Sequence, residues 1–210
     1  MFAPNNKHIT SAKCVLFLLA LLPAARLAWG VFNDALGANP LEFITRNSGD
    51  WTLYFLTAGL AITPLRRLLE ANWLIKFRRM LGLFAFFYAS LHFFAFFWFD
   101  HFFDVSEMLV DVVKRPFILV GFIAFVLLIP LAATSTNFMM RQIGGKNWQR
   151  LHKLVYLIAT LGLLHFWWMK AAKHNFGQPL LFIAIIGGLF AVRVYWKWGQ
   201  RANAVKPLAR

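Results

Sequence analysis

Long apolar segments separated by short polar connections run through the whole chain. Because about 20 apolar residues in a helix cross the hydrocarbon core of a bilayer, this pattern predicts six membrane-spanning helices. They lie near residues 13–32, 49–66, 79–99, 116–133, 151–169 and 179–198. An open sheet cannot satisfy its backbone hydrogen bonds in lipid. The predicted fold class is therefore an all-α membrane protein, a six-helix transmembrane bundle that forms one domain over residues 1–210.

Capping residues indicate where three of these helices begin. The run Asn47-Ser48-Gly49-Asp50 is a helix-start signal before the second apolar segment. Pro116 and Pro179 fit the first turns of the fourth and sixth helices, where a missing N–H is tolerated.

Composition and charge agree with a membrane protein. Of the 210 residues, 60% are hydrophobic and 14% are charged, and the formal net charge is +14. In a soluble chain such a charge would suggest nucleic-acid binding. Here Lys and Arg lie in short connections between apolar segments, which is the positive-inside pattern. We expect contact with membrane lipid and no binding of nucleic acid.

The distribution of charged residues predicts the orientation. Basic residues gather after the second and fourth helices and in the tail, at Arg66, Arg67, Lys76, Arg78, Arg79, Arg141, Lys146, Arg150, Lys197, Arg201, Lys206 and Arg210. Seven of the eight acidic residues lie in the other three loops. By the positive-inside rule, both termini are predicted to be cytoplasmic.

Three histidines lie in membrane-length segments, His92 in the third predicted helix and His152 and His165 in the fifth. An imidazole in hydrocarbon needs a partner, and haem iron is the partner that we expect. His92 lies 13 residues past Arg79, and His165 lies 13 residues past His152. Since both helices run outward, the helical rise predicts His92 and His165 at one level in the outer half of the membrane. Two facing imidazoles fill both axial positions of a haem, which favours electron transfer over oxygen chemistry.

Aromatic residues near these histidines are candidates for the wall of a haem pocket. They are Phe84, Phe86, Phe87, Phe93, Phe94, Phe96, Phe97, Phe166, Trp167 and Trp168. Contact with lipid is the alternative for many of these rings. The remaining histidines, His8, His101 and His174, lie in the tail and outer loops, where we expect them to be solvated.

His152 lies at the cytoplasmic side, where the third helix carries Arg78 and Arg79 in place of a second histidine. One possibility is an inner haem with His152 on one face. Another is an anionic group, such as a flavin phosphate, a haem propionate or a quinone headgroup, bound by His152 and the guanidinium groups. The arginines also fit a simpler role in orientation and lipid headgroup binding.

Other chemistry is poorly supported by the sequence. The single Cys14 excludes an intrachain disulfide, a four-cysteine zinc site and a cysteine-ligated iron–sulfur cluster. No nucleotide-binding fingerprint is present. The chemistry must therefore occur within the bundle or on a partner.

Four stretches carry a resemblance to a known family: NPLEFITRNSGDWTLYFLTAGLAITPLRR, RRMLGLFAFFYASLHF, KRPFILVGFIAFVLLIPLAATST and WQRLHKLVYLIATLGLLHFWW. Over almost its whole length the chain resembles the MsrQ or YedZ family, the haem-binding membrane subunits of the periplasmic protein-methionine-sulfoxide reductase system. That family is itself similar to the cytochrome b-type transmembrane domain of ferric reductases and NADPH oxidases.

The resemblance implies a multi-pass protein of the bacterial inner membrane that holds haem b through His92, His152 and His165. Electrons would come from the quinone pool or a cytoplasmic flavin reductase and pass to a periplasmic molybdenum-cofactor enzyme that reduces methionine sulfoxide in damaged proteins. The chain would be an electron-transfer subunit, and its partner would reduce the substrate. FMN is associated with the family, and Arg78 and Arg79 are where its phosphate is expected.

One departure from the wider pattern concerns the number of haems. The wider group pairs two histidines on each of two helices, whereas this chain has arginine at the inner level of its third helix. One haem or two are therefore both open.

Two other functions fit parts of the sequence. A quinone-linked cytochrome b could serve a different periplasmic oxidoreductase, with partner choice determined by the acidic outer loops. A small transporter could use buried His and Arg, but it would need acidic residues at the midplane and inverted repeats. The acidic residues lie almost entirely in outer loops instead.

Overall fold

The computed structural model describes residues 4–171 and 174–205; of the tail charges named above, Lys206 and Arg210 lie outside this part. The described residues form helices and no strand, which confirms the predicted all-α class. The elements are α1 Asn6–Phe32, α2 Pro40–Leu68, η1 Asn72–Leu74, α3 Ile75–Ala95, η2 Phe96–Asp100, α4 Val105–Lys114, α5 Pro116–Ala133, α6 Asn137–Ile143, α7 Gly145–Leu151, α8 Leu154–Ala171 and α9 Gly177–Val205.

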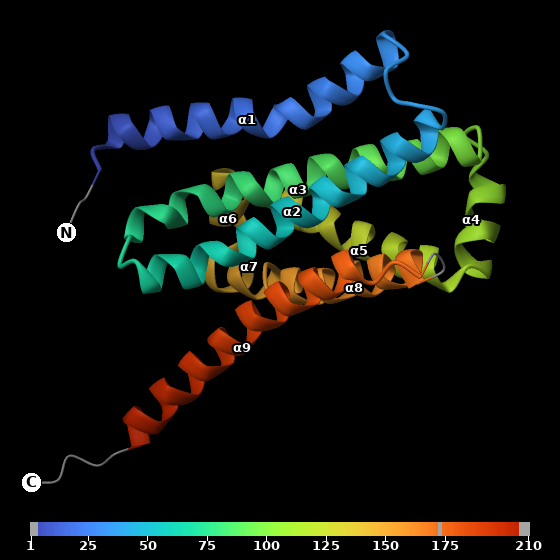
Figure 1. Ribbon diagram of the computed structural model, residues 1–210. Coiled ribbons are helices and arrows are strands. Elements are labelled where there is room, and N and C mark those ends of the chain that lie inside the picture. The colour runs from blue at the N-terminus through green and yellow to red at the C-terminus, as the bar shows by residue number, and fades with distance from the viewer. Residues whose placement is uncertain (1–3, 172–173, 206–210) are drawn as a thin grey trace, which may run out of the picture.

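In the described part of the chain, the bundle consists of six long helices, α1, α2, α3, α5, α8 and α9, and Figure 1 shows how they are arranged. The helix α2 packs along α3, and α5 packs along α8; the two pairs meet mainly between α3 and α5. The short helix α4 crosses one end of the bundle (Figure 1). We call this the α4 end. The opposite end, which carries η1, α6 and α7, is called the α6 end.

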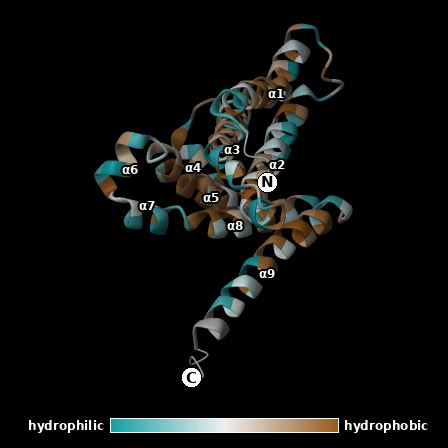
Figure 2. Ribbon diagram, turned by 90° about the vertical axis from the view of Figure 1, so that its left-hand side faces the viewer, coloured by the Kyte–Doolittle hydropathy of each residue, from teal (hydrophilic) through white to brown (hydrophobic). Residues whose placement is uncertain are grey.

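The apolar surface of the bundle fits a membrane. Among the described residues, five helical segments are long and apolar enough to span a bilayer: Asn6–Phe32, Asn72–Asp100, Pro116–Ala133, Gly145–Ala171 and Gly177–Gln200. Hydrophobic residues cover the long helices, and hydrophilic residues gather on α6, α7 and the end of α9 (Figure 2). Large side chains such as Leu18 and Trp29 are exposed, as lipid-facing residues must be. The protein is therefore a multi-pass membrane protein.

The helix α2 is not among the five segments. Charged residues interrupt both of its ends, at Glu42, Arg46 and Asp50 and again at Arg66 and Arg67. Membrane crossing by α2, and with it the six-span topology with cytoplasmic termini, stays a prediction.

The predicted start of the second helix was wrong. The helix α2 begins at Pro40, nine residues before the predicted start, and the side chain of Asn39 accepts a hydrogen bond from the backbone N–H of Glu42. The Ser48 hydroxyl donates to the carbonyl of Ile44 in its own helix instead of capping a new one. An Asn-Pro start with Glu in the first turn is the stronger signal. As a result Gly49 lies inside a helix.

The fifth predicted helix corresponds to α8, which begins three residues after the predicted start at residue 151. The helix α7 ends at Leu151, and α8 begins at Leu154, so that His152 lies at the junction. The basic connection before it folds into α6 and α7, separated by Gly144 at a φ of 81°, a conformation that favours glycine. The hydrophobic pattern gave no sign of these two short helices.

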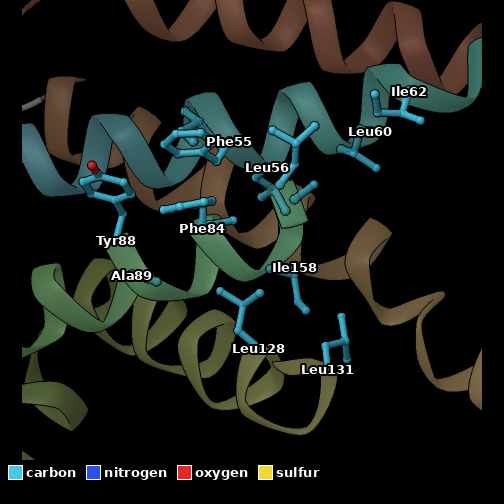
Figure 3. Packing of buried hydrophobic residues seen from close by; sticks show 14 of the residues in the cluster. Phe55, Leu56, Leu60, Ile62, Phe84, Tyr88, Ala89, Leu128, Leu131 and Ile158 are labelled. Atoms are coloured by element: carbon cyan, nitrogen blue, oxygen red, sulfur yellow. The ribbon is translucent and has the colours of Figure 1, made fainter. Parts of the chain in front are cut away.

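Aromatic packing joins the first three helices. The ring of Phe55 on α2 stacks on Phe84 and Tyr88 of α3, and all three side chains are buried (Figure 3). The Tyr88 hydroxyl donates to the carbonyl of Ala20 and accepts from the N–H of Ala24 on α1. These bonds are made beside Pro23, where the helical hydrogen-bond ladder is interrupted. Tyr88 thereby anchors α1 to the core.

A buried histidine lies beneath α4. His101 was expected to be solvated, but its side chain is only 5% exposed and packs against Phe96. Its Nε2 lies 3.5 Å from Asp111 Oδ2, and Arg115 Nε forms an ion pair with Asp111 Oδ1 at 2.7 Å. Neither ring nitrogen of His101 has a hydrogen-bond partner among the described residues. The turn after η2 folds the histidine under α4, an arrangement that loop composition alone does not reveal. His8 and His174 are exposed, as expected.

Candidate functional site

The structure brings His92 and His165 together between α3 and α8. Their ring centres lie 6.1 Å apart, with an angle of 78° between the ring planes. A metal–imidazole bond is about 2 Å long, and the ring centre lies about 1 Å behind the nitrogen, so two axial imidazoles on one metal need ring centres about 6 Å apart. The spacing of this pair fits a single shared metal ion.

Backbone carbonyls fix the orientation of both rings. His92 Nδ1 lies 2.8 Å from the carbonyl oxygen of Thr45 on α2, and His165 Nδ1 lies 2.7 Å from that of Phe117 on α5. Since a carbonyl can only accept, each Nδ1 carries the proton and each Nε2 keeps its lone pair. Among the described residues neither Nε2 has a hydrogen-bond partner. A neutral imidazole held in this way is ready to bind a metal.

Both rings line one cavity of about 410 Å³, enclosed by α2, α3, α5 and α8. Of the ten aromatic residues predicted for its wall, Phe93, Phe96 and Phe166 line it. Phe84 instead packs in the α2–α3 core, and Phe94 is exposed. The opposite wall comes from α5, where Phe117, Phe122 and Phe125 were not predicted.

Charged residues surround the α4 end of this cavity. Three cations, Arg46, Arg115 and Lys170, and two carboxylates, Asp50 and Asp100, line it, and Asp50 interacts electrostatically with both Lys170 and Arg46. The Lys170 ammonium also lies 5.4 Å from the ring centre of Phe166. Arg46 is paired with Glu42 and Arg115 with Asp111, so Lys170 is the least engaged of the three cations. This rim can accept the carboxylates of an amphipathic ligand.

His152 lies at the α6 end, away from the cavity. Its Nδ1 is 3.1 Å from the carbonyl oxygen of Trp148, its Nε2 is 3.5 Å from the Ser135 hydroxyl, and the Trp148 ring stacks on it at 3.8 Å. Arg78 interacts with it electrostatically. Arg79 was expected to share this site, but it is exposed and donates to Asn137 on α6 at 2.7 Å.

A half-buried arginine that sequence reasoning missed lies at the same end. The Arg193 guanidinium on α9 donates to the carbonyls of Leu60 and Leu189 and lies 5.7 Å from the Tyr156 ring centre. Arg78 interacts with it electrostatically. The Nε atoms of Arg193 and Arg66 are buried with no hydrogen-bond partner among the described residues. In sequence Arg193 looks like one more positive charge near the end of an apolar helix, so only packing reveals it.

The donor set decides which kind of metal the cavity suits. Within residues 4–171 and 174–205, no group of three or more His, Cys, Asp or Glu side chains could hold a metal ion. Two histidines alone suit an iron whose four equatorial ligands come from a porphyrin. The mainly apolar cavity suits the porphyrin ring, and the cations at its rim suit the propionates of that ring. The residues present therefore fit haem.

The helices and the cavity together define a multi-pass membrane protein with two histidines facing one apolar cavity between its helices. Residues 48–163 match the family described as "Ferric reductase like transmembrane component". This segment contains His92 and His152 and ends just before His165.

Relatives that match almost the whole chain belong to one more specific family. The "Protein-methionine-sulfoxide reductase heme-binding subunit MsrQ" of Herminiimonas arsenicoxydans is 66% identical over 202 residues, 96% of this chain and 93% of the relative. The proteins of the same name from Bordetella pertussis and Caulobacter vibrioides are 54% and 41% identical. The matched region covers 94% of this chain and 96% of the Bordetella pertussis protein, and 97% of this chain and 94% of the Caulobacter vibrioides protein. No solved structure matches. The chain belongs to the MsrQ family, within the ferric reductase-like group.

Proposed function

We propose that the chain is a membrane cytochrome b subunit that holds one b-type haem between the Nε2 atoms of His92 and His165. The observation that carries this proposal is the pair of carbonyl-anchored rings, 6.1 Å apart, on one apolar cavity. A haem bound there supplies a one-electron carrier in a low-dielectric environment. With His92 and His165 as its two protein ligands, such a haem would carry electrons, and substrate reduction would be left to a partner.

The cationic rim complements this site. We propose that Lys170, supported by Arg46, binds the propionates, which places the polar edge of the group at the α4 end. Guanidinium and ammonium groups are the usual partners of such carboxylates. The apolar walls then hold the remainder of the ring and exclude water.

A second proposed site lies at the α6 end, around His152 and Arg78, with Arg79 at its edge. Arg78 interacts with both His152 and Arg193, and the unpaired Nε atoms of Arg66 and Arg193 lie at the same end. Such a concentration of positive charge favours an anionic redox group: the phosphate of FMN, a quinone headgroup, or the propionates of a second haem ligated by His152.

The direction of electron flow follows from the predicted orientation. The α6 end would face the cytoplasm, where the quinone pool or a cytoplasmic flavin reductase donates electrons. The α4 end would face the periplasm of a bacterial inner membrane. The names of the relatives support a role as the haem-binding subunit of a protein-methionine-sulfoxide reductase. We propose that its partner is a periplasmic molybdenum-cofactor enzyme.

Purification of the full chain with adequate haem supply tests this function. The expected result is a b-type reduced-minus-oxidised spectrum, and quinol-driven reduction in liposomes that continues to the purified partner. Protein that folds but contains no haem would contradict the cofactor assignment. Reduction of the haem without transfer to the partner would contradict the partner assignment only.

A further inference from the structure

The His92 ring occupies the space that a side chain at Gly49 would fill. In an α-helix the residue four positions after a carbonyl donates its N–H to that carbonyl, and its Cβ leans back over it. Gly49 stands in this position after Thr45, the carbonyl that holds His92. A Cβ atom built on Gly49 would lie 3.1 Å from both Nδ1 and Cε1 of His92. The absence of a side chain therefore opens this carbonyl to the imidazole.

The same arrangement occurs on the other side of the cavity. Gly121 stands four residues after Phe117, the carbonyl that holds His165. A Cβ atom on Gly121 would lie 2.7 Å from Nδ1 and 2.9 Å from Cε1 of His165. Carbon atoms normally approach such neighbours to about 3.5–4.0 Å. The ring cannot move away freely, because its hydrogen bond to the carbonyl and its place on the cavity wall both fix it.

The two arrangements repeat along the chain. The two carbonyls are 72 residues apart, the two glycines 72, and the two histidines 73. Each histidine lies in a similar local sequence, Leu91-His92-Phe93-Phe94 and Leu164-His165-Phe166-Trp167. In each case the helix with the carbonyl and the glycine comes first and packs along the helix with the histidine, α2 along α3 and α5 along α8. The cavity is thus built by two similarly constructed helix pairs.

Other glycines in these four helices lack such contacts. A Cβ atom on Gly59 would meet only Leu81 Cβ, at an ordinary 3.8 Å, and one on Gly82 or Gly162 would meet nothing within 4 Å. The close approach is therefore specific to the two glycines behind the paired histidines.

We propose that Gly49 and Gly121 are positioning residues for the two imidazoles. By leaving the carbonyls of Thr45 and Phe117 open, they hold each ring at a fixed angle with Nδ1 protonated and Nε2 free. The inference rests on the proposed function, because it assigns the glycines a role toward an iron between the rings. Orientation and hydrogen bonding of axial imidazoles tune the iron. The two glycines therefore help to set its midpoint potential and its retention.

The variants Gly121→Ala and Gly49→Ala test this inference, with Gly59→Ala as the control on α2. All three gain the same methyl group and the same helix propensity. Because partners that orient a metal ligand are worth about 10–100-fold in metal affinity, we expect Gly121→Ala to retain haem at least about tenfold less well. Gly49→Ala, with the longer contact, should show a smaller loss. The haem that remains should have a shifted midpoint potential and altered low-spin EPR g values, whereas Gly59→Ala should match the parent protein.

The outcomes separate this inference from the proposed function. A parent protein without haem would contradict the proposed function. A parent protein with haem, and alanine variants whose potentials and g values match it, would overturn the inference alone.

If an alanine variant fails to fold, a double substitution shows whether the contact with the histidine ring is the cause. Removing the imidazole removes the contact, so Gly121→Ala with His165→Ala, or Gly49→Ala with His92→Ala, should accumulate as folded apoprotein at the level of the single His→Ala variant. Failure of the double variant to recover would show that the glycine serves packing unrelated to the ring and would also overturn the inference.

Discussion

At the α4 end, His92 and His165 each commit one ring nitrogen to a backbone carbonyl of a neighbouring helix and leave the other without a partner beside a shared cavity. At the α6 end, His152 has both nitrogens near protein oxygens, and an indole ring covers one of its faces. All three histidines lie in or beside apolar helices, yet only the first two are arranged as a ligand pair.

Under the proposed function, the difference indicates what prepares a membrane histidine to bind a metal. A carbonyl contact on Nδ1 fixes the tautomer, and an open space beside Nε2 admits the metal. Both conditions depend on a second helix, which supplies the carbonyl and leaves room for the ring. His152 takes its carbonyl contact from its own helical turn, at Trp148, and its Nε2 lies 3.5 Å from the Ser135 hydroxyl. Its neighbourhood is suited to anions instead, because of the charge of Arg78 and Arg193.

The largest expected effect is the loss of the ligand pair. His92→Ala and His165→Ala each remove one axial ligand, so each should abolish the six-coordinate low-spin haem signal of the purified protein. The control is His174→Ala, at an exposed position near the same end, which should retain the parental spectrum. A low-spin bis-histidine signal that persists in either ligand variant would place the haem elsewhere.

Next in size is the effect of the cationic rim. Lys170→Ala should weaken haem retention by about tenfold, since a hydrogen bond to a charged group contributes about 1.5–3 kcal/mol. Arg46→Ala should have a smaller effect, because Arg46 already pairs with Glu42. Haem transfer to an apoprotein acceptor measures the difference, with Lys114→Ala on the exposed face of α4 as the matched control. Equal rates for Lys170→Ala and Lys114→Ala would exclude the rim from propionate binding.

A more modest effect is expected at the α6 end, where the two neighbouring arginines differ. Arg78 interacts with His152 and Arg193, whereas Arg79 is engaged with Asn137. Arg78→Ala should therefore slow quinol-driven haem reduction by about threefold, a size typical of a partly exposed charged contact. Arg79→Ala should have less effect, and Lys146→Ala, an exposed basic control in α7, should have none. The reverse order of Arg78 and Arg79 would move the donor site toward α6.

The smallest expected effect concerns Trp148, which stacks on His152 and donates from its indole Nε1 to the carbonyl of Thr134 at 2.9 Å. Trp148→Phe keeps a stacking ring but loses this hydrogen bond, so the free energy of unfolding should fall by about 1 kcal/mol. Thermal unfolding in detergent measures this change. The haem spectrum should not change; a spectral shift as large as that of a ligand variant would tie His152 directly to the haem.

Much of the fold could be predicted from the sequence because lipid imposes a simple rule on segment length and polarity. The long helices and the shared level of His92 and His165 followed from that rule and from the helical rise. The start of α2 did not, because Asn47-Ser48-Gly49-Asp50 looks like a cap until Asn39-Pro40 is seen to begin the helix earlier. The short helices α6 and α7 were missed because hydropathy carries no signal for them.

The site was predicted less completely than the fold. The histidine pair could be identified from spacing, but their carbonyl partners lie 47 and 48 residues away and carry no side-chain signature. Gly121 could have been noticed from the 72-residue repeat, once Gly49 was placed inside α2. Arg193 and the buried His101 depend on packing between distant segments, which hydrophobic periodicity does not encode.

The central claim is that one haem is bound between His92 and His165 and that His152 is not a ligand of that haem. Low-temperature EPR together with near-infrared magnetic circular dichroism of the ferric protein tests it most directly, in the parent, His92→Ala and His152→Ala. We expect a bis-imidazole low-spin signal in the parent and in His152→Ala, and its absence in His92→Ala. A bis-imidazole signal that survives in His92→Ala but disappears in His152→Ala would contradict the claim.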